Sequence, residues 1–496
     1  MRLRGTTHGG GVSCGLDDAA PWPVFDPAPV ILVSATTVDL ARAQFATTSL
    51  YHFLFVPLTL GLGPIVAVFQ TMWRRTGDES WLRLTHFFGT LFLINFAIGV
   101  ATGLVQEFQF GMNWSVYSKF VGNVFGAPLA IEGLAAFFLE STFLGLWIFG
   151  WDRLSPRLHL ATLWIAVAGT WLSAYFILVA NSFMQDPVGY KIENGQAVLT
   201  SVSALLSSRW AIYAFVHTIL AGLTCGAAVV FGVCCWHFAR GRNVELFRPA
   251  VKVALIVLVP VSCFNMWFGS HFGILVTELQ PMKISAAEAQ WKDCQKCAFS
   301  LFQVGGFSES DQTPTFSIEI PGLLSYLSTG SFKGKVTGLT ELNNQYERQY
   351  GRGNYLPPVE AIYWSMRGMA YAGSVVALVS LVGAFLFWKR RLERLKWFLW
   401  IGVVTSFVPF VATTFGWLLT ELGRQPWIVQ GLLKTSNANS PAVGTTWLVI
   451  SLAVFVSLYV MLGVLDIWLM RRYAGRDPSS PAGKPGDTSP TPAVGY

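Results

Sequence analysis

Charged side chains are scarce in this sequence of 496 residues: Asp, Glu, Lys and Arg together supply 12% of it, and hydrophobic types supply 53%. Soluble domains carry about twice that share of charged residues, so the composition excludes a chain built mainly of soluble domains. The net charge of +7 does not indicate nucleic-acid binding. Lys and Arg cluster in short segments between long apolar stretches, which is typical of residues that determine membrane topology.

Cysteine is also infrequent, and the spacing of the seven residues matches no zinc finger. Four of them lie in apolar segments and are interpreted as small core residues: Cys225, Cys234, Cys235 and Cys263. Cys294 and Cys297 form an isolated C-x-x-C pair. Ala298 follows where a c-type haem attachment site needs His, so that site is excluded. A local disulfide and a pair of free thiols both remain open.

Apolar stretches of about 20 residues recur along the chain, the length that an α-helix needs to cross a hydrocarbon core of about 30 Å. Nine such stretches predict an all-α integral membrane protein. The predicted transmembrane helices cover approximately residues 49–72, 86–106, 126–150, 160–184, 210–238, 252–275, 358–387, 397–420 and 446–470. We expect residues 1–40 to be a disordered N-terminal extension and residues 473–496 a disordered cytoplasmic tail, both rich in Pro and polar or small residues.

The distribution of basic residues predicts the orientation of these helices. One set of connections is rich in them: Arg74, Arg75, Arg83, Arg153, Arg157, Arg240, Arg242, Arg248, Lys389, Arg390, Arg391, Arg394, Lys396, Arg471, Arg472 and Arg476. The short connections on the opposite side hold few: Lys119, Lys191, Arg209, Arg424 and Lys434. Because cytoplasmic loops are enriched in Lys and Arg, we expect the N-terminus outside and the C-terminus in the cytoplasm.

One connection is much longer than the others. Residues 276–357 are polar and fall on the external side, between helices 1–6 (41–275) and helices 7–9 (358–472). The segment predicts a small extramembrane substructure with a helix through Ser285–Trp291. Long connections in compact proteins are often functional.

Several ionisable residues fall inside the predicted spans, where a charge at the bilayer centre costs about 3 kcal/mol on insertion scales. They are His52, Glu132, Glu140, His217, Arg367 and Glu421, with Glu107 and Arg424 at span ends. The predicted orientation places most of them in the outer half of the membrane. Glu140 lies about 12 Å deeper than Glu132 at 1.5 Å per residue. Independent helices therefore deliver imidazole, carboxylate and guanidinium groups to one layer.

Each of these residues also has a structural interpretation. A single histidine or methionine is commonly a core residue, a glutamate can serve a transporter's proton relay, and an arginine near a helix end can reach the interface. Together they favour haem, because imidazole and thioether ligate iron and guanidinium pairs with propionates. Trp417, Glu421 and Arg424 are spaced i, i+4, i+7 and share a helix face that could meet one macrocycle. From the residues alone, a membrane redox protein and a transporter both remain open.

Longer motifs narrow this choice. The segment Gly423–Trp427 reads GRQPW. Five other stretches accompany it: YHFLFVPLTLG at 51–61, INFAIGVATGLVQEFQFGMNWS at 94–115, FGAPLAIEGLAAFFLESTFLGLWIFGWDR at 125–153, FVHT at 215–218 and YWSMRGM at 363–369. From about residue 38 to about 472 the chain resembles subunit I of the cytochrome bd-type quinol:oxygen oxidases.

The resemblance implies nine spans and three haems: a low-spin haem b, a high-spin haem b and a chlorin-type haem d. By motif match, His217 and Met369 are expected to be the axial ligands of the low-spin haem b. His52 and Glu421 are each expected to ligate one of the other two haems, with the assignment between them open. Glu132 is expected at the haem d pocket, as a proton-delivering carboxylate or a further iron ligand.

The same resemblance implies roles for the remaining residues. Three arginines match positions near haem propionates: Arg42, Arg367 and Arg424. Trp417 matches an aromatic residue between haems, and Glu140 matches a carboxylate of the proton channel. Glu107 matches an acidic residue of less defined role. Lys283 and Glu288, in QPMKISAAEAQW, match the pair implicated in quinol oxidation. The sequence departs from the family pattern at Gly368, where bulkier residues are usual.

These expectations describe a terminal respiratory oxidase subunit of the bacterial inner membrane. It would oxidise a membrane quinol on the outer side, reduce dioxygen to water and build a proton gradient without pumping. The implied partners are a second large membrane subunit, subunit II, and in some assemblies a small single-helix subunit, with no nucleic acid. Two alternatives remain open: a transporter, and a haem-b quinol dehydrogenase without oxygen chemistry.

Overall fold

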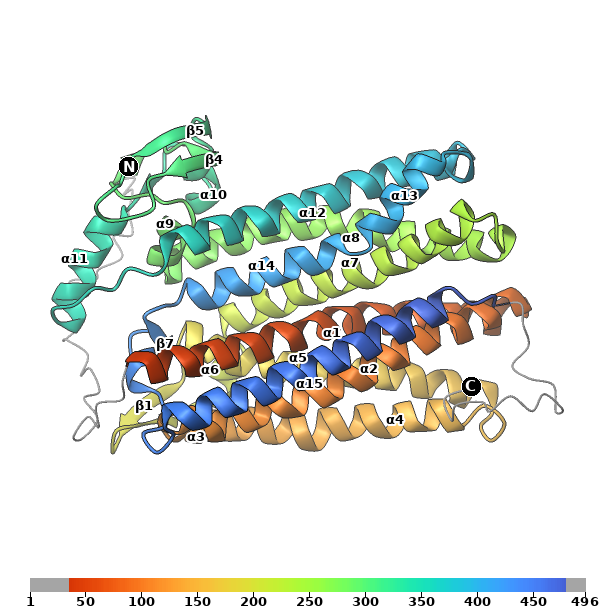
Figure 1. Cartoon of the computed structure of the whole chain (residues 1–496), viewed down its shortest axis with the longest axis horizontal. Helices are drawn as coiled ribbons and strands as arrows, with labels where there is room; N and C mark the ends of the chain where they lie inside the picture. Colours follow the sequence, from red (N-terminus) through yellow and green to blue (C-terminus); the bar gives the residue numbers. More distant parts are fainter. Residues whose placement is uncertain (1–34, 479–496) are drawn as a thin grey trace, which may run out of the picture.

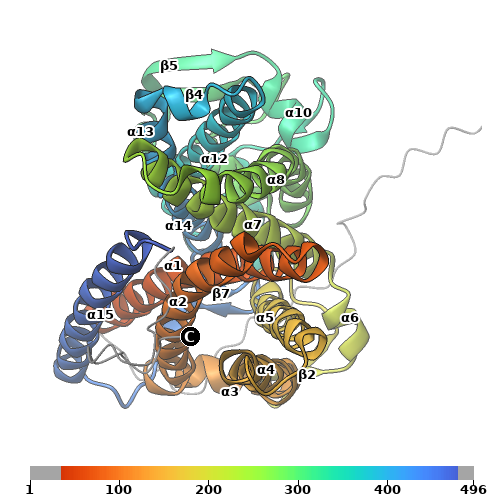
Figure 2. The ribbon, with the colours of Figure 1, turned by 90° about the vertical axis from the view of Figure 1, so that its right-hand side faces the viewer.

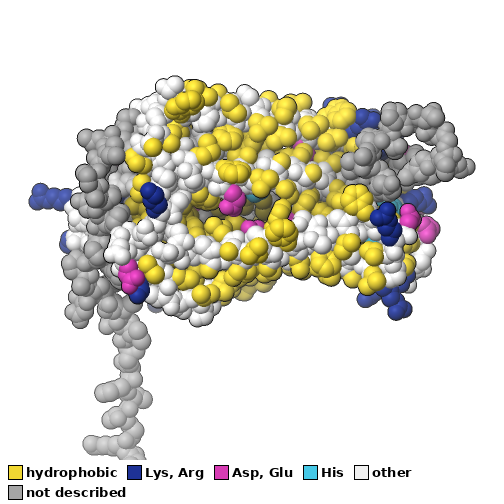
Figure 3. Space-filling model, turned by 90° about the horizontal axis from the view of Figure 1, so that it is seen from below, with side chains coloured by type: hydrophobic (Ala, Val, Ile, Leu, Met, Phe, Trp, Pro, Cys, Tyr) yellow, Lys and Arg dark blue, Asp and Glu magenta, His cyan; other side chains and the backbone are white. Residues whose placement is uncertain are grey.

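The computed structural model describes residues 35–478, so the expectations for residues 1–34 and 479–496 lie outside the described residues. Within the described part, nine helical segments are long and apolar enough to cross a membrane, which confirms the nine predicted spans. They run side by side along the long axis of the molecule (Figure 1). On the flank drawn in Figure 3, Lys and Arg side chains lie toward the two ends of a hydrophobic belt, as expected of a protein in a bilayer, and a few acidic side chains lie in a hollow within the belt.

The spans are longer than predicted and include breaks. Their helices are α1 (Ala35–Thr76), α2 (Glu79–Met112), α3 (Ser115–Ile131) with α4 (Phe138–Phe149), α5 (Pro156–Gln185), α7 (Arg209–Ala239), α8 (Val244–Leu279), α12 (Val359–Trp388), α13 (Lys396–Thr405) with α14 (Val408–Leu422), and α15 (Thr445–Ala474). Because α1 begins at Ala35, residues 35–40 are helical rather than part of a disordered extension. In the same way α15 continues to Ala474.

Two spans are irregular, and the local sequence explains one of them. Span three contains a π-helical segment, η1 (Glu132–Phe137), between α3 and α4. Span eight is divided into α13 and α14. Pro409, in the first turn of α14, lacks the N–H that would continue the hydrogen-bond ladder, but it fits the start of a helix. Both irregular segments precede acidic side chains of the candidate site, Glu140 and Glu421.

The long connection between α8 and α12 is folded, as predicted. Its elements are α9 (Pro281–Ala287), β3 (Cys294–Gln295), β4 (Phe299–Gly305), β5 (Pro314–Ile320), α10 (Leu323–Thr329), β6 (Lys335–Val336) and α11 (Leu339–Tyr350). β4 pairs antiparallel with β5, and β3 with β6. Cys294 and Cys297 form a disulfide, which resolves the alternative left open by the sequence.

The predicted helix over Ser285–Trp291 is displaced. α9 begins four residues earlier because Pro281 occupies its first turn, where proline is favoured. It ends before Ala289, whose positive φ of 48° is incompatible with a continuing helix. Glu288 consequently caps α9 at its C-terminal end instead of lying in its middle.

The remaining elements close the ends of the bundle. They are the hairpin β1 (Tyr190–Glu193) and β2 (Gln196–Leu199), α6 (Val202–Leu206), η2 (Leu392–Arg394), the hairpin β7 (Trp427–Val429) and β8 (Leu433–Lys434), and η3 (Thr435–Asn437). Seen end-on, α1 lies between a group containing α7, α8 and α12 and a group containing α2 to α5 (Figure 2). α1 packs against both α2 and α7.

The crossing of α1 and α7 depends on glycine. A Cβ atom on Gly61 would lie 1.8 Å from the carbonyl oxygen of Gly222, and one on Gly226 would lie 2.3 Å from the carbonyl carbon of Gly61. Gly222 and Gly226 are spaced as in a G-x-x-x-G motif, which allows membrane helices to approach closely. This contact sets the position of α1, the helix that carries His52.

We predict that Gly226→Ala lowers the thermal stability of the assembled protein by an amount equivalent to about 1–3 kcal/mol, because the added methyl group overpacks this crossing. The measurement is the midpoint of thermal unfolding in detergent. Gly145→Ala is the matched control, because a Cβ there meets nothing within 4 Å. Equal midpoints for the two variants would contradict the close approach of α1 and α7.

Candidate functional site

His52, on α1, is held in one tautomer by Thr102 on α2. The Thr102 hydroxyl lies 3.0 Å from His52 Nδ1 and 3.0 Å from the backbone oxygens of Ile98 and Gly99. Because Thr102 donates its hydroxyl hydrogen to these carbonyl oxygens, the hydroxyl oxygen accepts a hydrogen bond from the Nδ1–H of His52. Nε2 then keeps its lone pair, as a metal-ligating histidine requires.

Glycine packs closely against three of the expected ligand side chains. A Cβ on Gly103 would lie 3.1 Å from His52 Cε1, and one on Gly269 would lie 3.3 Å from His217 Cε1. A Cβ on Gly416 would lie 3.0 Å from the sulfur of Met369. A larger residue at any of these positions would crowd the side chain beside it.

His217 and Met369 lie on α7 and α12. α8, which carries Gly269, packs against both helices, and α14, which carries Gly416, packs against α12 and α7. The buried Nδ1 of His217 has no hydrogen-bond partner within residues 35–478. A neutral imidazole and a thioether are suitable axial ligands for a haem iron.

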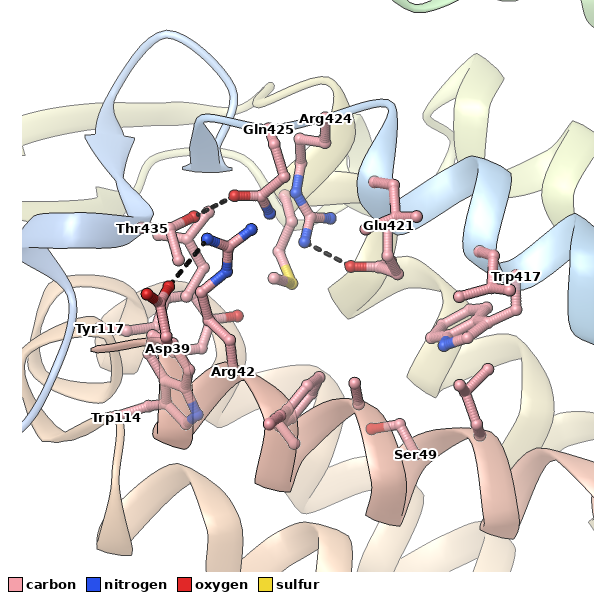
Figure 4. A pocket seen from close by; sticks show the side chains of 18 of the residues that line it. Asp39, Arg42, Ser49, Trp114, Tyr117, Trp417, Glu421, Arg424, Gln425 and Thr435 are labelled. Atoms are coloured by element: carbon pink, nitrogen blue, oxygen red, sulfur yellow. Dashed lines mark hydrogen bonds and ion pairs between the residues drawn. The ribbon is translucent and has the colours of Figure 1, made fainter. Parts of the chain in front are cut away.

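A cavity of about 340 Å³ lies between α1, α14 and the connections at the same end of the bundle. Four residues singled out from the sequence line it together: Arg42, Trp417, Glu421 and Arg424. Figure 4 shows Glu421 and Arg424 beside Trp417, with Arg42 across the cavity on α1. The helix face predicted from their i, i+4, i+7 spacing therefore borders one space, although α14 ends at Leu422.

Glu421 is partnered on both oxygens. Arg424 Nη2 lies 2.5 Å from Oε2, and Asn181 Nδ2 donates to Oε1 over 3.0 Å. These two donors fix the position of the carboxylate beside the cavity. The Trp417 ring stacks on the Phe53 ring at a centroid distance of 5.0 Å. Phe53 directly follows His52 in α1.

Three buried donors that line the cavity have no hydrogen-bond partner in the described chain: Arg424 Nη1, Trp114 Nε1 and Tyr117 OH. Arg42, which lines the same space, pairs with Asp39 at 3.6 Å and is otherwise exposed. Unpartnered buried donors are rare in proteins and indicate a ligand with acceptor atoms. The carboxylates of a haem propionate have this chemistry, so the residues present fit the group that the sequence implies.

Arg367 is buried on α12, and Glu288 accepts from its Nη2 over 2.7 Å and from its Nη1 over 3.3 Å. Its other hydrogen bonds go to the backbone oxygens of Ala287 and Ser300. All of these partners belong to the long connection between α8 and α12, so Arg367 fastens this loop to the bundle.

Lys283 is also buried at the loop–bundle boundary. Its Nζ donates to Gln185 Oε1 over 2.7 Å and lies 4.8 Å from the centre of the Trp210 ring. Its aliphatic stem packs on Gly423, where a Cβ would lie 2.5 Å from Lys283 Cγ. Lys283 thus touches the turn that places Arg424 beside the cavity.

Burial determines the protonation of both loop residues. Desolvation lowers the pKa of Lys283 well below its ordinary value, and the nearby Arg424 guanidinium lowers it further, against the opposing effect of Glu421. Desolvation raises the pKa of Glu288, although the Arg367 guanidinium acts in the opposite direction. A buried carboxyl of raised pKa and a polarised amine suit proton exchange with a substrate hydroxyl.

The other carboxylates lie along span three and the end of α2. Ser173 donates to Glu132 over 2.6 Å, and Glu132 is close enough to interact electrostatically with Glu107 and Glu140. The π segment adds one residue to its turn, so the eight-residue step from Glu132 to Glu140 turns about as far as seven residues of a regular α-helix. This rotation is within about 20° of two full turns. Glu132 and Glu140 therefore share a side of the helix more closely than a regular helix allows.

Sequence analysis missed several residues of this site: Thr102, Trp114, Tyr117, Asn181 and Gln185. All are neutral polar or aromatic residues that act by orienting or satisfying a charged neighbour. The sequence offered a weak signal for Asn181 and Gln185, because both are amides near the end of an apolar span. Thr102 gave none, because threonine is common in membrane helices.

A bundle of membrane helices that carries imidazole, thioether and carboxylate groups, with unpartnered donors around a cavity, has the features of a membrane-embedded haem oxidoreductase. The chain belongs to the family of cytochrome bd terminal oxidase subunit I, whose sequence model matches residues 40–478. This confirms the resemblance identified from the motifs and makes the chain one subunit of a multi-subunit, haem-containing oxidase of the bacterial membrane.

Two curated relatives span nearly the whole described chain. It is 43% identical to cytochrome bd ubiquinol oxidase subunit 1 of Bacillus subtilis, covering 87% of this chain and 92% of that protein. It is 37% identical to cytochrome bd-II ubiquinol oxidase subunit 1 of Escherichia coli, covering 89% and 97%. The solved structure of bd oxidase from Geobacillus thermodenitrificans matches with a TM-score of 0.80 at 26% identity, covering 88% of this chain and 98% of that one.

We predict that Thr102→Val weakens ligation by His52, because the Nδ1–H loses its acceptor and the ring can take the other tautomer. The optical spectrum of the haem bound by His52 should shift, while the total haem content remains. Thr102→Ser retains the hydroxyl and should keep the parent spectrum. Identical spectra for the Val and Ser variants would refute this role of Thr102.

Proposed function

We propose that this chain oxidises a membrane quinol beneath its external loop and delivers the electrons to an oxygen-reducing haem site inside the bundle. The observation that carries the proposal is the position of Lys283. It is buried against the turn of Gly423 and Arg424 that borders the cavity of Glu421. The turn of Gly423 and Arg424 thus contacts Lys283 of the loop on one side and borders the cavity of Glu421 on the other.

The loop residues suit quinol oxidation. A quinol that becomes a quinone releases two electrons and two protons, and the protons need an acceptor next to the hydroxyl groups. Glu288, once ionised, accepts a proton, and Arg367 holds its carboxylate in place. Lys283 donates a hydrogen bond that orients the second oxygen, and Gln185 fixes its ammonium or amine group.

The residues inside the bundle would hold three haems: a low-spin haem b between His217 and Met369, and a high-spin haem b and a haem d served by His52 and Glu421. When bound, these groups supply electron transfer and an iron site for oxygen. The chain would position them: Thr102 sets the tautomer of His52, Asn181 and Arg424 fix the carboxylate of Glu421, and Arg424, Arg42 and Trp114 would bind the propionates.

Oxygen reduction to two waters consumes four electrons and four protons. We propose that the protons reach the site from the cytoplasm through Glu140, which is buried, and then Glu132, on the same side of the helix across the π segment. Quinol releases its protons on the outer side. Uptake on one side and release on the other builds a proton gradient without a pump, given the topology inferred from the basic residues.

The relatives inform the substrate and the partner. Two are named ubiquinol oxidases, and a third, 26% identical over 88% of this chain, is named a putative menaquinol oxidase of B. subtilis. A lipid-soluble quinol is accordingly the substrate that we propose. Because the relatives are numbered first subunits, the proposed assembly includes the second large membrane subunit.

We predict that Glu288→Gln lowers quinol-dependent oxygen consumption by about 10²-fold or more, because the substrate hydroxyl loses its proton acceptor. In the parent enzyme the rate should fall as pH decreases through the raised pKa of Glu288, since only the ionised carboxylate accepts a proton. Glu319→Gln, on the exposed strand β5 of the same loop, is the control and should retain activity.

The dithionite-reduced spectrum separates the two halves of the proposal. The Glu288→Gln variant should retain the bands of haem b and of a chlorin, because the loop does not ligate iron. A purified complex without a chlorin band would refute the assignment of haem d. Full quinol oxidation by the variant would refute the role of Glu288 while leaving the family assignment intact.

We predict that Glu140→Gln slows proton uptake during oxygen reduction by about 10²-fold, because an amide cannot relay a proton. The measurement is the rate of potential formation in proteoliposomes after oxygen is added to the reduced enzyme. Glu79→Gln, at the start of α2 and exposed, is the control. A parent-like rate in Glu140→Gln would contradict this route.

A further inference from the structure

The hairpin of β4 and β5 in the external loop has one apolar face. Phe302 pairs with Ile318 and Val304 with Phe316 across the two strands, so these side chains share a face with Ile320. The five residues are between 40% and 53% exposed. The opposite face carries polar side chains, of which Glu319 is exposed, Ser317 is partly buried and Gln303 is buried. An exposed apolar face of this extent indicates an interaction surface.

The hairpin lies against α12 well beyond the start of that helix. The Tyr371 hydroxyl donates to the backbone oxygen of Leu301, and the Phe302 ring contacts the Trp364 ring edge-on at a centroid distance of 5.4 Å. Tyr371 lies 12 residues after Val359, about 18 Å along the helix. α12 is about 45 Å long, so a hydrocarbon layer of about 30 Å centred on it begins roughly 8 Å from its start.

The apolar face is continuous with the outward surface of α12. A row of α12 residues at spacings of three and four is exposed, and its members are Tyr371, Val375, Leu378, Val382 and Phe385. Trp364, one heptad before Tyr371, extends this row toward the hairpin and is covered by Phe302. In the end-on view, β4 and β5 project beyond α12 at the edge of the bundle, rather than over its centre (Figure 2).

We propose that this hairpin lies on the membrane and that its apolar face contacts the acyl chains of phospholipids in the leaflet at the Val359 end of α12. A lipid surface fits better than a soluble partner because the face begins at the depth where the exposed row of α12 already meets lipid. The exposed part of the opposite face, with Glu319, then points to water. The external loop is thereby anchored at the bilayer as well as to the bundle.

The hydrogen bonds of the hairpin agree with this placement. Arg367 satisfies the backbone oxygen of Ser300, and Tyr371 satisfies that of Leu301, so β4 has backbone acceptors covered where it meets α12. β5 pairs only with β4 in the described chain. Its outer edge has backbone groups that hydrocarbon cannot satisfy, so this edge must face the headgroups and water while the apolar face meets the acyl chains.

Collision accessibility of a nitroxide label tests the proposal in the assembled oxidase, reconstituted in phospholipid nanodiscs. Cys263 is exposed and is first replaced by serine, whereas the other free cysteines are buried. The label is placed at Ile318→Cys. Glu319→Cys, the next residue on the polar face, is the matched water control, and Leu378→Cys on α12 is the lipid control.

We expect the ratio of collisions with oxygen to collisions with a water-soluble nickel chelate at Ile318→Cys to approach that at Leu378→Cys. It should be several-fold above the ratio at Glu319→Cys, because oxygen concentrates in lipid and the chelate in water. A ratio equal to that at Glu319→Cys would overturn the proposal, as would low collision with both reagents, which would indicate a protein partner. Val304→Cys, on the same face, repeats the test if Ile318→Cys does not assemble.

Discussion

A polar group inside a hydrocarbon layer must find its partner within the protein, and this constraint organises the whole molecule. Glu288 is buried with Arg367, Lys283 with Gln185, and Glu421 with Arg424 and Asn181. Where the described chain offers no partner, as at Arg424 Nη1, Trp114 and Tyr117, the unpartnered donors surround a cavity. The pattern of satisfied and unsatisfied groups therefore separates structural pairs from places prepared for a ligand.

The pair of Arg367 and Glu288 has consequences beyond its own contact. Because Arg367 also holds the backbone oxygens of Ala287 and Ser300, one guanidinium connects α12 to α9 and to strand β4. Replacing one partner of such a buried pair typically leaves an uncompensated charge, so the whole loop depends on it. The position of Glu288 for substrate and the position of the hairpin at the lipid boundary are coupled through this side chain.

Much of the fold was predictable because its signals are local. The nine spans follow from apolar length, whereas the break before α14 was not expected, although Pro409 explains it. The shared border of Trp417, Glu421 and Arg424 on one cavity follows from helical spacing. The π segment was not predictable, since the sequence FGAPLAIEGLAAFFLE also suits a regular helix, and neither was the start of α9 four residues before the predicted helix. The hydrogen-bond partners of Arg367 were not expected, because a motif identifies a residue without specifying which neighbour folds against it.

The sequence by itself determined that this is a membrane protein, which side chains it buries at a cost, and the family to which it belongs. These properties depend on composition, helical period and contiguous motifs, all of which are local. Only the tertiary structure decided the tautomer of His52, the partners of Lys283 and Arg367, the close packing of glycines on His217 and Met369, and the amphipathic hairpin on α12. Each of these depends on contacts between segments distant in sequence, which packing selects and no single segment encodes.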